Sequence, residues 1–211
     1  MSAKEKMSAV ILAGGKSSRM GQNKMFLPLG GKPVILHLLE VVKQVFAECI
    51  VVTDEPALYQ NYAVKVVQDI IVCREKNSLT GIHAGLFTAQ YPFAFMLAGD
   101  MPFVQPQVLS YLCTYADDCD VVVPKGGRFY QPLCAIYHKN CLPLIEKQLR
   151  DGIFRIDRFF PQVRLCEVDI IELKHFDPKG YTFFNINTPE DYVKACKIYQ
   201  MLQCQGQFSG R

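Results

Sequence analysis

Short apolar runs alternate along this chain with segments of helical period, and this alternation restricts the fold more than any other feature. The runs are rich in β-branched or aromatic residues, as buried strands are, and they cover residues 9–13, 49–53, 64–68, 93–98 and 120–124. Helices are expected between them, one opening at Pro33 and two over about 81–89 and 105–115. Repeated strand, helix, strand units predict right-handed crossovers and a three-layer, doubly wound α/β fold with a mostly parallel sheet.

The pattern changes after Pro124 without a linker or a repeat. We expect a strand over 128–138, helices over 139–150 and 154–160, and a late strand over 182–187. At roughly 150 residues per domain, a chain of 211 residues favours one domain over two, spanning 1–211. The Gln- and Gly-rich tail 203–211 is expected to be disordered. The residues Met-Ser-Ala at 1–3 are repeated at 7–9, and residues 1–6 are therefore expected to be a dispensable leader or the result of an alternative start.

Composition excludes several classes of protein. A net charge of +3 is too small for a nucleic-acid binder recognised by bulk charge. The nine cysteines form no C-x-x-C pair, and their odd number argues against a closed disulfide framework. The longest apolar region, 34–52, is interrupted by charged and polar residues, so no membrane span is expected. We therefore expect a cytoplasmic protein that binds neither nucleic acid nor membrane.

Ligands of open parallel sheets bind beyond the carboxyl ends of the strands. The loops that begin there start at Gly14, Asp54, Asp69, Gly99 and Lys125. The first of them, within residues 12–24, carries three glycines and three cations, and offers backbone N–H groups and positive charge to an anion. It has neither the G-x-G-x-x-G of dinucleotide-binding folds nor the glycine spacing of a P-loop.

This loop, L-A-G-G-x-S-x-R-M-G-x-x-K directly after the first strand, resembles the signature of nucleotidyltransferases. Further motifs are similar to those of the molybdenum cofactor guanylyltransferases and follow in the same order: Gly31-Lys-Pro33, Gln68-Asp69, Gly81-x-x-Ala-Gly85, Gly99-Asp-Met-Pro102, Gln131-Pro-Leu133 and Asn185-Ile-Asn-Thr-Pro-Glu-Asp191. The resemblance covers nearly the whole chain. It implies a Rossmann-like nucleotidyltransferase fold, with a nucleotide-binding half over about 8–124 and an acceptor-substrate half over about 125–200.

The resemblance also implies an activity. Members of this family transfer GMP from GTP to the terminal phosphate of Mo-molybdopterin, release pyrophosphate and form molybdopterin guanine dinucleotide, with Mg²⁺ as cofactor. Transient contacts with cofactor-insertion proteins and apo-molybdoenzymes are expected on the same grounds.

The residue types suit such a transfer. A phosphate nucleophile is already ionised, so no general base is required, and the barrier lies in bringing two anions together. Arg19 and Lys24 are the predicted catalytic cations on the phosphates of GTP, and Lys16 is a weaker candidate. Asp100 follows the apolar run 93–98, where a carboxylate can either hold Mg²⁺ or cap the next turn. The resemblance makes it the catalytic, metal-binding aspartate.

Nucleotide-binding residues are implied along the same sheet edge. They are Leu12, Ala13, Gly14, Gly15, Lys24, Thr53, Asp69, Gly85 and Asp100. Thr53 stands where an asparagine is expected, which leaves its contact open. Gly14 lacks the Cβ of the alanine in related cytidylyltransferases, and it either admits the larger purine or serves only the turn.

Acceptor-binding residues implied by the resemblance are Gln131, Asn185 and Asn187. The two asparagines are two positions apart, so in a strand their amides share a face. The residues that follow, 188–191, read Thr-Pro-Glu-Asp, which predicts a helix start resembling a capping box.

Other residues have two interpretations. His83 lies in a motif where family members often carry Pro-Leu at 82–83, and it either touches the nucleotide or is structural. The aromatic residues near the acceptor side either form a pterin shelf or pack in the core; they are Phe129, Tyr130, Phe159 and Phe160.

Two other functions remain open. A cytidylyltransferase of the same fold would use CTP, with molybdopterin or a sugar or polyol phosphate as acceptor. A non-catalytic protein that escorts the cofactor would bind GTP without releasing pyrophosphate. The joint presence of Arg19, Lys24 and Asp100 favours an enzyme.

Overall fold

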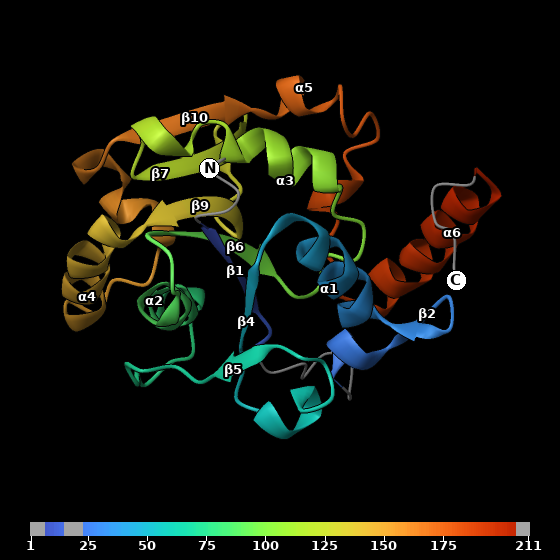
Figure 1. Ribbon diagram of the computed structural model, residues 1–211, viewed down its shortest axis with the longest axis horizontal. Helices are drawn as coiled ribbons and strands as arrows, with labels where there is room; N and C mark the ends of the chain where they lie inside the picture. The colour runs from blue at the N-terminus through green and yellow to red at the C-terminus, as the bar shows by residue number, and fades with distance from the viewer. Residues whose placement is uncertain (1–6, 15–22, 206–211) are drawn as a thin grey trace.

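A computed structural model describes residues 7–14 and 23–205 (Figure 1). The main sheet has the strand order β10-β7-β9-β6-β1-β4-β5, and β8 pairs with β7. Its strands are β1 (Met7–Leu12), β4 (Glu48–Val52), β5 (Lys65–Val67), β6 (Phe93–Ala98), β7 (Val121–Gly126), β8 (Phe129–Tyr130), β9 (Cys134–His138) and β10 (Leu165–Asp169). β2 (Pro28–Leu29) and β3 (Lys32–Pro33) form a separate antiparallel pair.

Parallel pairing dominates the main sheet. β1 runs parallel to β4 and β6, β4 to β5, and β10 to β7, whereas β9 is antiparallel to both β6 and β7. Leu12 at the end of β1 lies opposite Val52 of β4 and Ala98 of β6. Three strands therefore end together at one edge of the sheet. The predicted mostly parallel α/β fold is confirmed.

Helices cover both faces of this sheet (Figure 1). The α-helices are α1 (Val34–Val45), α2 (Ser78–Thr88), α3 (Pro106–Cys113), α4 (Leu142–Arg150), α5 (Ile170–Leu173) and α6 (Pro189–Cys204), of which α6 packs against β2 beside the main sheet. α1 packs with α3 on one face, and α2 with α4 on the other. None of the helices in the described ranges is long and apolar enough to cross a membrane.

The alternation of side chains along β1 explains the two faces. Ala9 and Ile11 belong to the core that contains α1 and α3, whereas Val10 and Leu12 belong to the core that contains α2 and α4. Successive residues of a strand point to opposite faces, so a strand with apolar residues at every position is buried on both sides. This is why the apolar runs predict a sheet covered by helices on both faces.

The late strand expected over 182–187 is wrong. Tyr181–Phe183 form a 3₁₀ helix, because the Asp177 carboxylate accepts hydrogen bonds from the backbone N–H groups of Tyr181 and Thr182 at 3.0 and 2.6 Å. Farther on, the backbone N–H of Ile186 donates to the carbonyl of Asp100 at 3.0 Å. This segment is therefore tied to the loop after β6 and is not a member of the sheet.

Other boundaries also differ from expectation. The strand expected over 128–138 is divided into β8 and β9 by a turn at 131–133, and the helix expected over 154–160 is a 3₁₀ helix at Ile156–Gln162. β10 was not predicted, because its residues are mostly polar or half-buried at the sheet edge. α6 extends to Cys204, into the tail expected to be disordered. Residues 1–6 and 206–211 lie outside the described residues.

Candidate active site

Backbone hydrogen bonds hold the carboxyl ends of β1, β4 and β6 together. The N–H of Ala13 donates to the carbonyl of Val52 at 2.9 Å, and the N–H of Gly99 donates to the carbonyl of Leu12 at 3.0 Å. The loops that follow these strands start next to one another, at the edge where open parallel sheets bind ligands. Gly15, Lys16 and Arg19 belong to the first loop and lie outside the described residues, so their predicted roles stay predictions.

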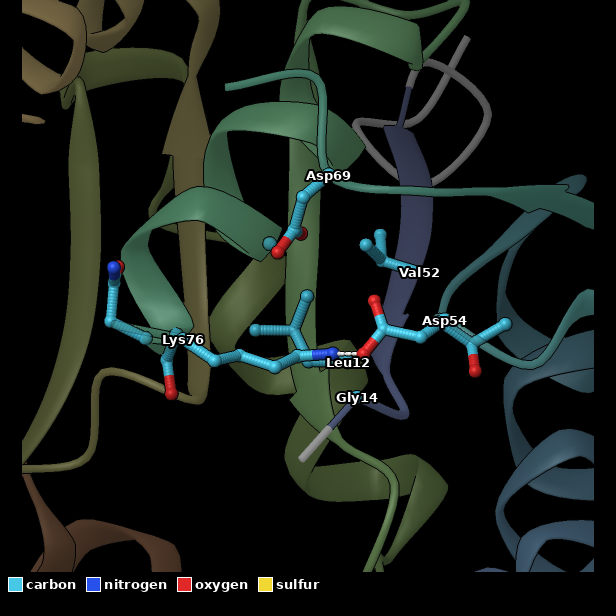
Figure 2. Close-up of a pocket in the computed structure, with 10 residues that line it drawn as sticks. Leu12, Gly14, Val52, Asp54, Asp69 and Lys76 are labelled. Carbon is cyan, nitrogen blue, oxygen red and sulfur yellow. Dashed lines mark ion pairs between the residues drawn. The ribbon is translucent and has the colours of Figure 1, made fainter. Parts of the chain in front are cut away.

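A pocket opens on the β4 side of β1, and the start of α2 forms part of its wall (Figure 2). Its lining residues are Leu12, Gly14, Val52, Thr53, Asp54, Asp69, Lys76, Asn77, Ser78 and Gly81. Four of the predicted nucleotide-binding residues, from three separate segments of the chain, therefore come together here. They are Leu12, Gly14, Thr53 and Asp69.

Two glycines of α2 have different surroundings. Gly81 lines the pocket, and a Cβ there would lie 3.1 Å from Cδ2 of Leu12. Gly85 lies one turn later, where a Cβ would come within 2.2 Å of Cγ1 of Val10. Gly85 allows α2 to pack closely on β1. The structure does not bring this residue to the pocket lining.

Asp69 is the half-buried acid of the pocket. Its desolvation raises the pKa of the carboxyl group, and the hydroxyl of Thr80, which donates to Oδ2 at 2.9 Å, partly opposes that rise. The hydroxyl of Thr53 accepts from the backbone N–H of Glu55 at 3.1 Å and so closes the turn after β4. The residue that replaces the expected asparagine thus stabilises the loop at the pocket wall.

Charged and amide side chains gather on the other side of β1, beside β6. Nζ of Lys24 forms an ion pair with Oδ2 of Asp100 and donates a hydrogen bond to Oδ1 of Asn187 at 3.0 Å. Nδ2 of Asn185 donates to Oδ1 of Asp100 at 3.4 Å. The side chains of Lys24 and Asp100 are 18% and 9% exposed, so solvent screens their charges only in part. Four predicted site residues therefore form one cluster.

Local structure holds each member of this cluster in place. Lys24 begins a 3₁₀ helix, Lys24–Phe26, which is capped by the side chain of Asn23. Asp100 follows Gly99, where a Cβ would lie 2.9 Å from Sδ of Met25, so the loop passes close to this side chain. Asn187 precedes Thr188, the N-cap of α6, where the expected capping box is present.

The remaining acceptor-side candidates lie elsewhere. Gln131 is in the turn after β8, and its backbone N–H donates to the carbonyl of Pro124 at the carboxyl end of β7, two places from β6 in the sheet. Phe159 and Phe160 are buried in the core beside α4, which supports the packing interpretation for both. Phe129 is 69% exposed, and the hydroxyl of Tyr130 donates to Glu167.

His83 contacts α4 and does not line the pocket. Its Nε2 lies 3.2 Å from Oε1 of Glu146, and its ring is stacked on Phe87 with 6.0 Å between the centroids. The side chain is almost fully buried between α2 and α4. This environment supports the structural interpretation of His83.

Comparison with known proteins decides the family. Residues 9–163 match the family described as the MobA-like NTP transferase domain. The chain belongs to the MobA-like NTP transferases. The resemblance inferred from the sequence motifs is thereby confirmed.

This NTP transferase has well-matched relatives along most of its length. It is 36% identical to the probable molybdenum cofactor guanylyltransferase of Natranaerobius thermophilus, over 92% of this chain and 96% of that protein. It is also 36% identical to the molybdenum cofactor guanylyltransferase of Desulfosudis oleivorans, over 90% and 94% of the two chains. Among solved structures, it is similar to the molybdopterin-guanine dinucleotide biosynthesis protein A of Archaeoglobus fulgidus, with a TM-score of 0.81, 30% identity and coverage of 92% and 100%.

The cluster in this NTP transferase offers oxygen ligands suited to a hard divalent cation. Asp100 supplies a carboxylate at the loop after β6, and Asn187 supplies an amide oxygen beside it. Within 7–14 and 23–205, no three His, Cys, Asp or Glu side chains are grouped as a metal cage. A cation held here would take few ligands from protein and the rest from water and phosphate oxygens, which is how Mg²⁺ is commonly bound.

The site of this NTP transferase also contains residues that the sequence did not single out. Asp54 and Lys76 line the pocket and form an ion pair with each other. Asp54 stands at the start of a loop after a parallel strand, and this position indicated that it lies at the ligand-binding edge of the sheet. It did not indicate a role for the residue. Lys76 lies in the connection before α2, and no local pattern indicates that it turns back over Gly14.

Proposed function

We propose that this chain transfers GMP from GTP to the terminal phosphate of Mo-molybdopterin, forming molybdopterin guanine dinucleotide and releasing pyrophosphate. The observation that carries the proposal is the cluster of Lys24, Asp100, Asn185 and Asn187 beside a pocket at the carboxyl ends of β1, β4 and β6. The names of the relatives support the choice of base and acceptor.

In this proposal the pocket and the cluster bind different parts of GTP. The base and ribose of GTP would occupy the pocket of Leu12, Gly14 and Asp69 on the β4 side of β1. The triphosphate would then extend from the pocket towards the β6 side, where Lys24 and Asp100 lie. In this arrangement Gly15 and Arg19 bind phosphate, as proposed from the sequence.

Electrostatics supplies most of the catalysis in this proposal. Two unit charges at about 4 Å interact by roughly 4 kcal/mol at an effective dielectric constant near 20, so a cation beside the reacting phosphates strongly lowers their repulsion. Lys24 is in such a position, and Asn187 restricts the orientation of its ammonium group. The acceptor phosphate is already ionised, so the chain needs only to align it with the α-phosphorus and to neutralise charge.

Mg²⁺ is the proposed cofactor. Asp100 would hold it, with Asn187 available as a second oxygen ligand, and Asn185 keeps the Asp100 carboxylate oriented. When bound, the cation would stabilise negative charge on the phosphate oxygens. Lys24 occupies Oδ2 of Asp100 here, and its flexible side chain can release that oxygen when phosphate is present.

The acceptor is proposed to approach from the side of Asn185 and Asn187, with Gln131 farther along the same sheet edge. Asn187 contacts Lys24 directly. An acceptor that binds Asn187 would therefore also affect the position of the Lys24 ammonium group at the phosphates. The reaction is proposed to take place in the cytoplasm, because the odd number of cysteines and the absence of a C-x-x-C pair argue against a disulfide framework.

Pyrophosphate release tests the proposed function. The assay uses the full chain, Mg²⁺ and Mo-molybdopterin, and compares GTP, CTP, ATP and UTP, with Asp100→Asn as the inactive control. We expect release with GTP alone. Release with CTP would replace the guanylyltransferase by a cytidylyltransferase of the same fold. GTP binding without release in any combination would support a cofactor-escort protein.

A further inference from the structure

An ion pair crosses the nucleotide pocket from wall to wall. Lys76, in the connection before α2, and Asp54, just after β4, point towards each other across the opening (Figure 2). In that view Asp69 lies above the pair and Gly14 below it. The side chains of Lys76 and Asp54 are 33% and 58% exposed, so the pair lies at the mouth of the pocket.

Gly14 provides the space that the Lys76 ammonium occupies. A Cβ on Gly14 would lie 2.9 Å from Nζ and 3.0 Å from Cε of Lys76. The absence of a side chain at Gly14 therefore lets Lys76 reach over the end of β1.

Stabilisation of the fold does not account for this pair. Both residues lie in loops, and exposed ion pairs contribute little to stability because water and side-chain entropy offset the attraction. Burial in the pocket lowers the pKa of Lys76, so part of the hydration of the ammonium is lost there. The charges are also separate from the Lys24 and Asp100 cluster that the proposed transfer uses.

We propose that Lys76 and Asp54 recognise the guanine base of GTP by exchanging their mutual ion pair for hydrogen bonds to its polar edge. The Lys76 ammonium donates to O6, and the Asp54 carboxylate accepts from N1–H and from the 2-amino group. This inference rests on the proposed function, because it specifies how that same site selects its nucleotide.

The chemistry of the bases explains why such a pair would select guanine. Guanine presents an acceptor, O6, next to two donors that lie side by side, a pattern that matches an ammonium and the two oxygens of a carboxylate. Adenine has a donor amino group in place of O6, where it would face the ammonium, and cytosine offers a single amino group followed by acceptors. Each wrong base would leave a charged group of the pocket without its partner, which is the strongest basis for discrimination.

Nucleotide binding to the full chain tests the proposal. Calorimetric titration measures the Kd values of GTP, ITP, ATP and CTP with Mg²⁺ and without acceptor, for the wild type, Asp54→Asn and Lys76→Met. ITP lacks only the 2-amino group of GTP. The matched controls are Glu40→Gln and Lys32→Met, which alter an exposed ion pair of the same type on another part of the chain. Thermal unfolding checks that all variants are folded.

Asp54→Asn is expected to weaken GTP binding by about tenfold or more, the effect of one charge-assisted hydrogen bond, and to weaken ITP binding less, because ITP keeps N1–H but lacks the 2-amino group. Lys76→Met is expected to weaken GTP and ITP together and to leave ATP unchanged. An equal loss for all four nucleotides would show a general charge effect and overturn the proposal, as would an unchanged ratio of GTP to ITP affinity in Asp54→Asn.

The same titrations separate this inference from the proposed function. If the wild type binds CTP more tightly than GTP, the guanylyltransferase proposal fails and the base recognition fails with it. If the wild type prefers GTP and releases pyrophosphate, but Asp54→Asn keeps the wild-type selectivity, only the recognition by this pair is overturned.

Discussion

Nζ of Lys24 forms an ion pair with Oδ2 of Asp100, although the two residues are 76 positions apart in the sequence. Parallel pairing of β1 with β6 brings their loops together, and the segment before α6 adds Asn185 and Asn187 to the same cluster. The charges of Lys24 and Asp100 are partly shielded from water, so solvent weakens their electrostatic interactions only in part.

Lys24→Met is expected to lower kcat for pyrophosphate release by roughly a hundredfold, the usual effect of removing one preorganised group that stabilises transition-state charge. Lys24→Arg should retain part of the activity, because it keeps the charge but not the geometry of the ammonium. Lys32→Met is the matched control, since Lys32 is exposed and pairs with Glu40. Wild-type turnover in Lys24→Met would contradict a role at the phosphates.

Removal of divalent cations should stop turnover in the wild type. We expect a chelator to abolish pyrophosphate release and added Mg²⁺ to restore it, because the Asp100 carboxylate and the phosphates would share the cation. Asp100→Asn should release no pyrophosphate at the Mg²⁺ concentrations that support wild-type turnover. A Mg²⁺ titration of initial rates measures both effects, and activity that persists in excess chelator would exclude the proposed cofactor.

The sequence predicts the part of the site whose residues belong to recognisable motifs. Lys24, Asp100 and the asparagine pair follow recognisable motifs, and the apolar runs predict which strands lie side by side. Asn185 and Asn187 reach the cluster even though their expected strand is absent, because a hydrogen bond from Ile186 to the carbonyl of Asp100 holds the segment. The family motif therefore predicted that these two residues belong to the site, whereas the expected strand was wrong.

Long-range side-chain packing accounts for what the sequence missed. The motif around Gly85 indicated a nucleotide contact, but the short distance to Val10 gives this glycine a packing role. Similarly, the ion pair of Lys76 with Asp54 depends on how the connection before α2 reaches over Gly14 to the loop after β4. Neither contact produces a local pattern in a single sequence. The first depends on the distance between α2 and the sheet, and the second on the distance between the loop before α2 and the sheet.

The free energy of unfolding should fall at acid pH because Asp120 becomes protonated. Asp120 lies just before β7, at the end of the sheet opposite the candidate site. Hydrogen bonds from the side chain of Arg164, followed by those from its backbone N–H and from Asn140, lower the pKa of Asp120 from 3.8 to about 2. A carboxyl whose pKa is lower in the folded state stabilises the protein above its unfolded pKa, and this contribution is lost as the pH falls from about 4 to about 2.

Asp120→Asn tests this pH dependence. The variant should lose about 1 kcal/mol of unfolding free energy at pH 7, a value reduced by the solvent exposure of Arg164. The difference from the wild type should shrink as the pH approaches 2. Urea unfolding at a series of pH values measures it, and a difference that stays constant with pH would show that the ionised carboxylate is not the cause.

Gly85→Ala and Gly14→Ala should differ sharply in stability. The added Cβ at Gly85 would collide with Val10, a stiff β-branched residue of β1, so we expect a loss of about 1–3 kcal/mol. At Gly14 the nearest atom is the flexible end of Lys76, which can move away. Urea unfolding compares the two, and Val10→Ala should rescue Gly85→Ala. Equal losses in both variants would contradict the packing role of Gly85.

Thr188→Ala should reduce both stability and activity, because Thr188 connects α6 to the active site. Its hydroxyl accepts from the backbone N–H of Asp191 at 3.2 Å, while the Asp191 carboxylate accepts from the backbone N–H groups of Thr188 and Asn187 at 3.1 and 3.2 Å. Loss of an N-cap hydroxyl costs about 1 kcal/mol. The same loss loosens the backbone of Asn187, whose side chain contacts Lys24.

Thr188→Ser provides the matched control, because it keeps the capping oxygen. Unfolding free energy and kcat should both return to nearly wild-type values in Thr188→Ser, while Thr188→Ala should lose about 1 kcal/mol of stability together with several-fold activity at a temperature where it is fully folded. If Thr188→Ala loses stability but keeps the wild-type kcat, the cap serves only the helix, and the position of Asn187 is fixed by the hydrogen bond between Ile186 and Asp100 instead.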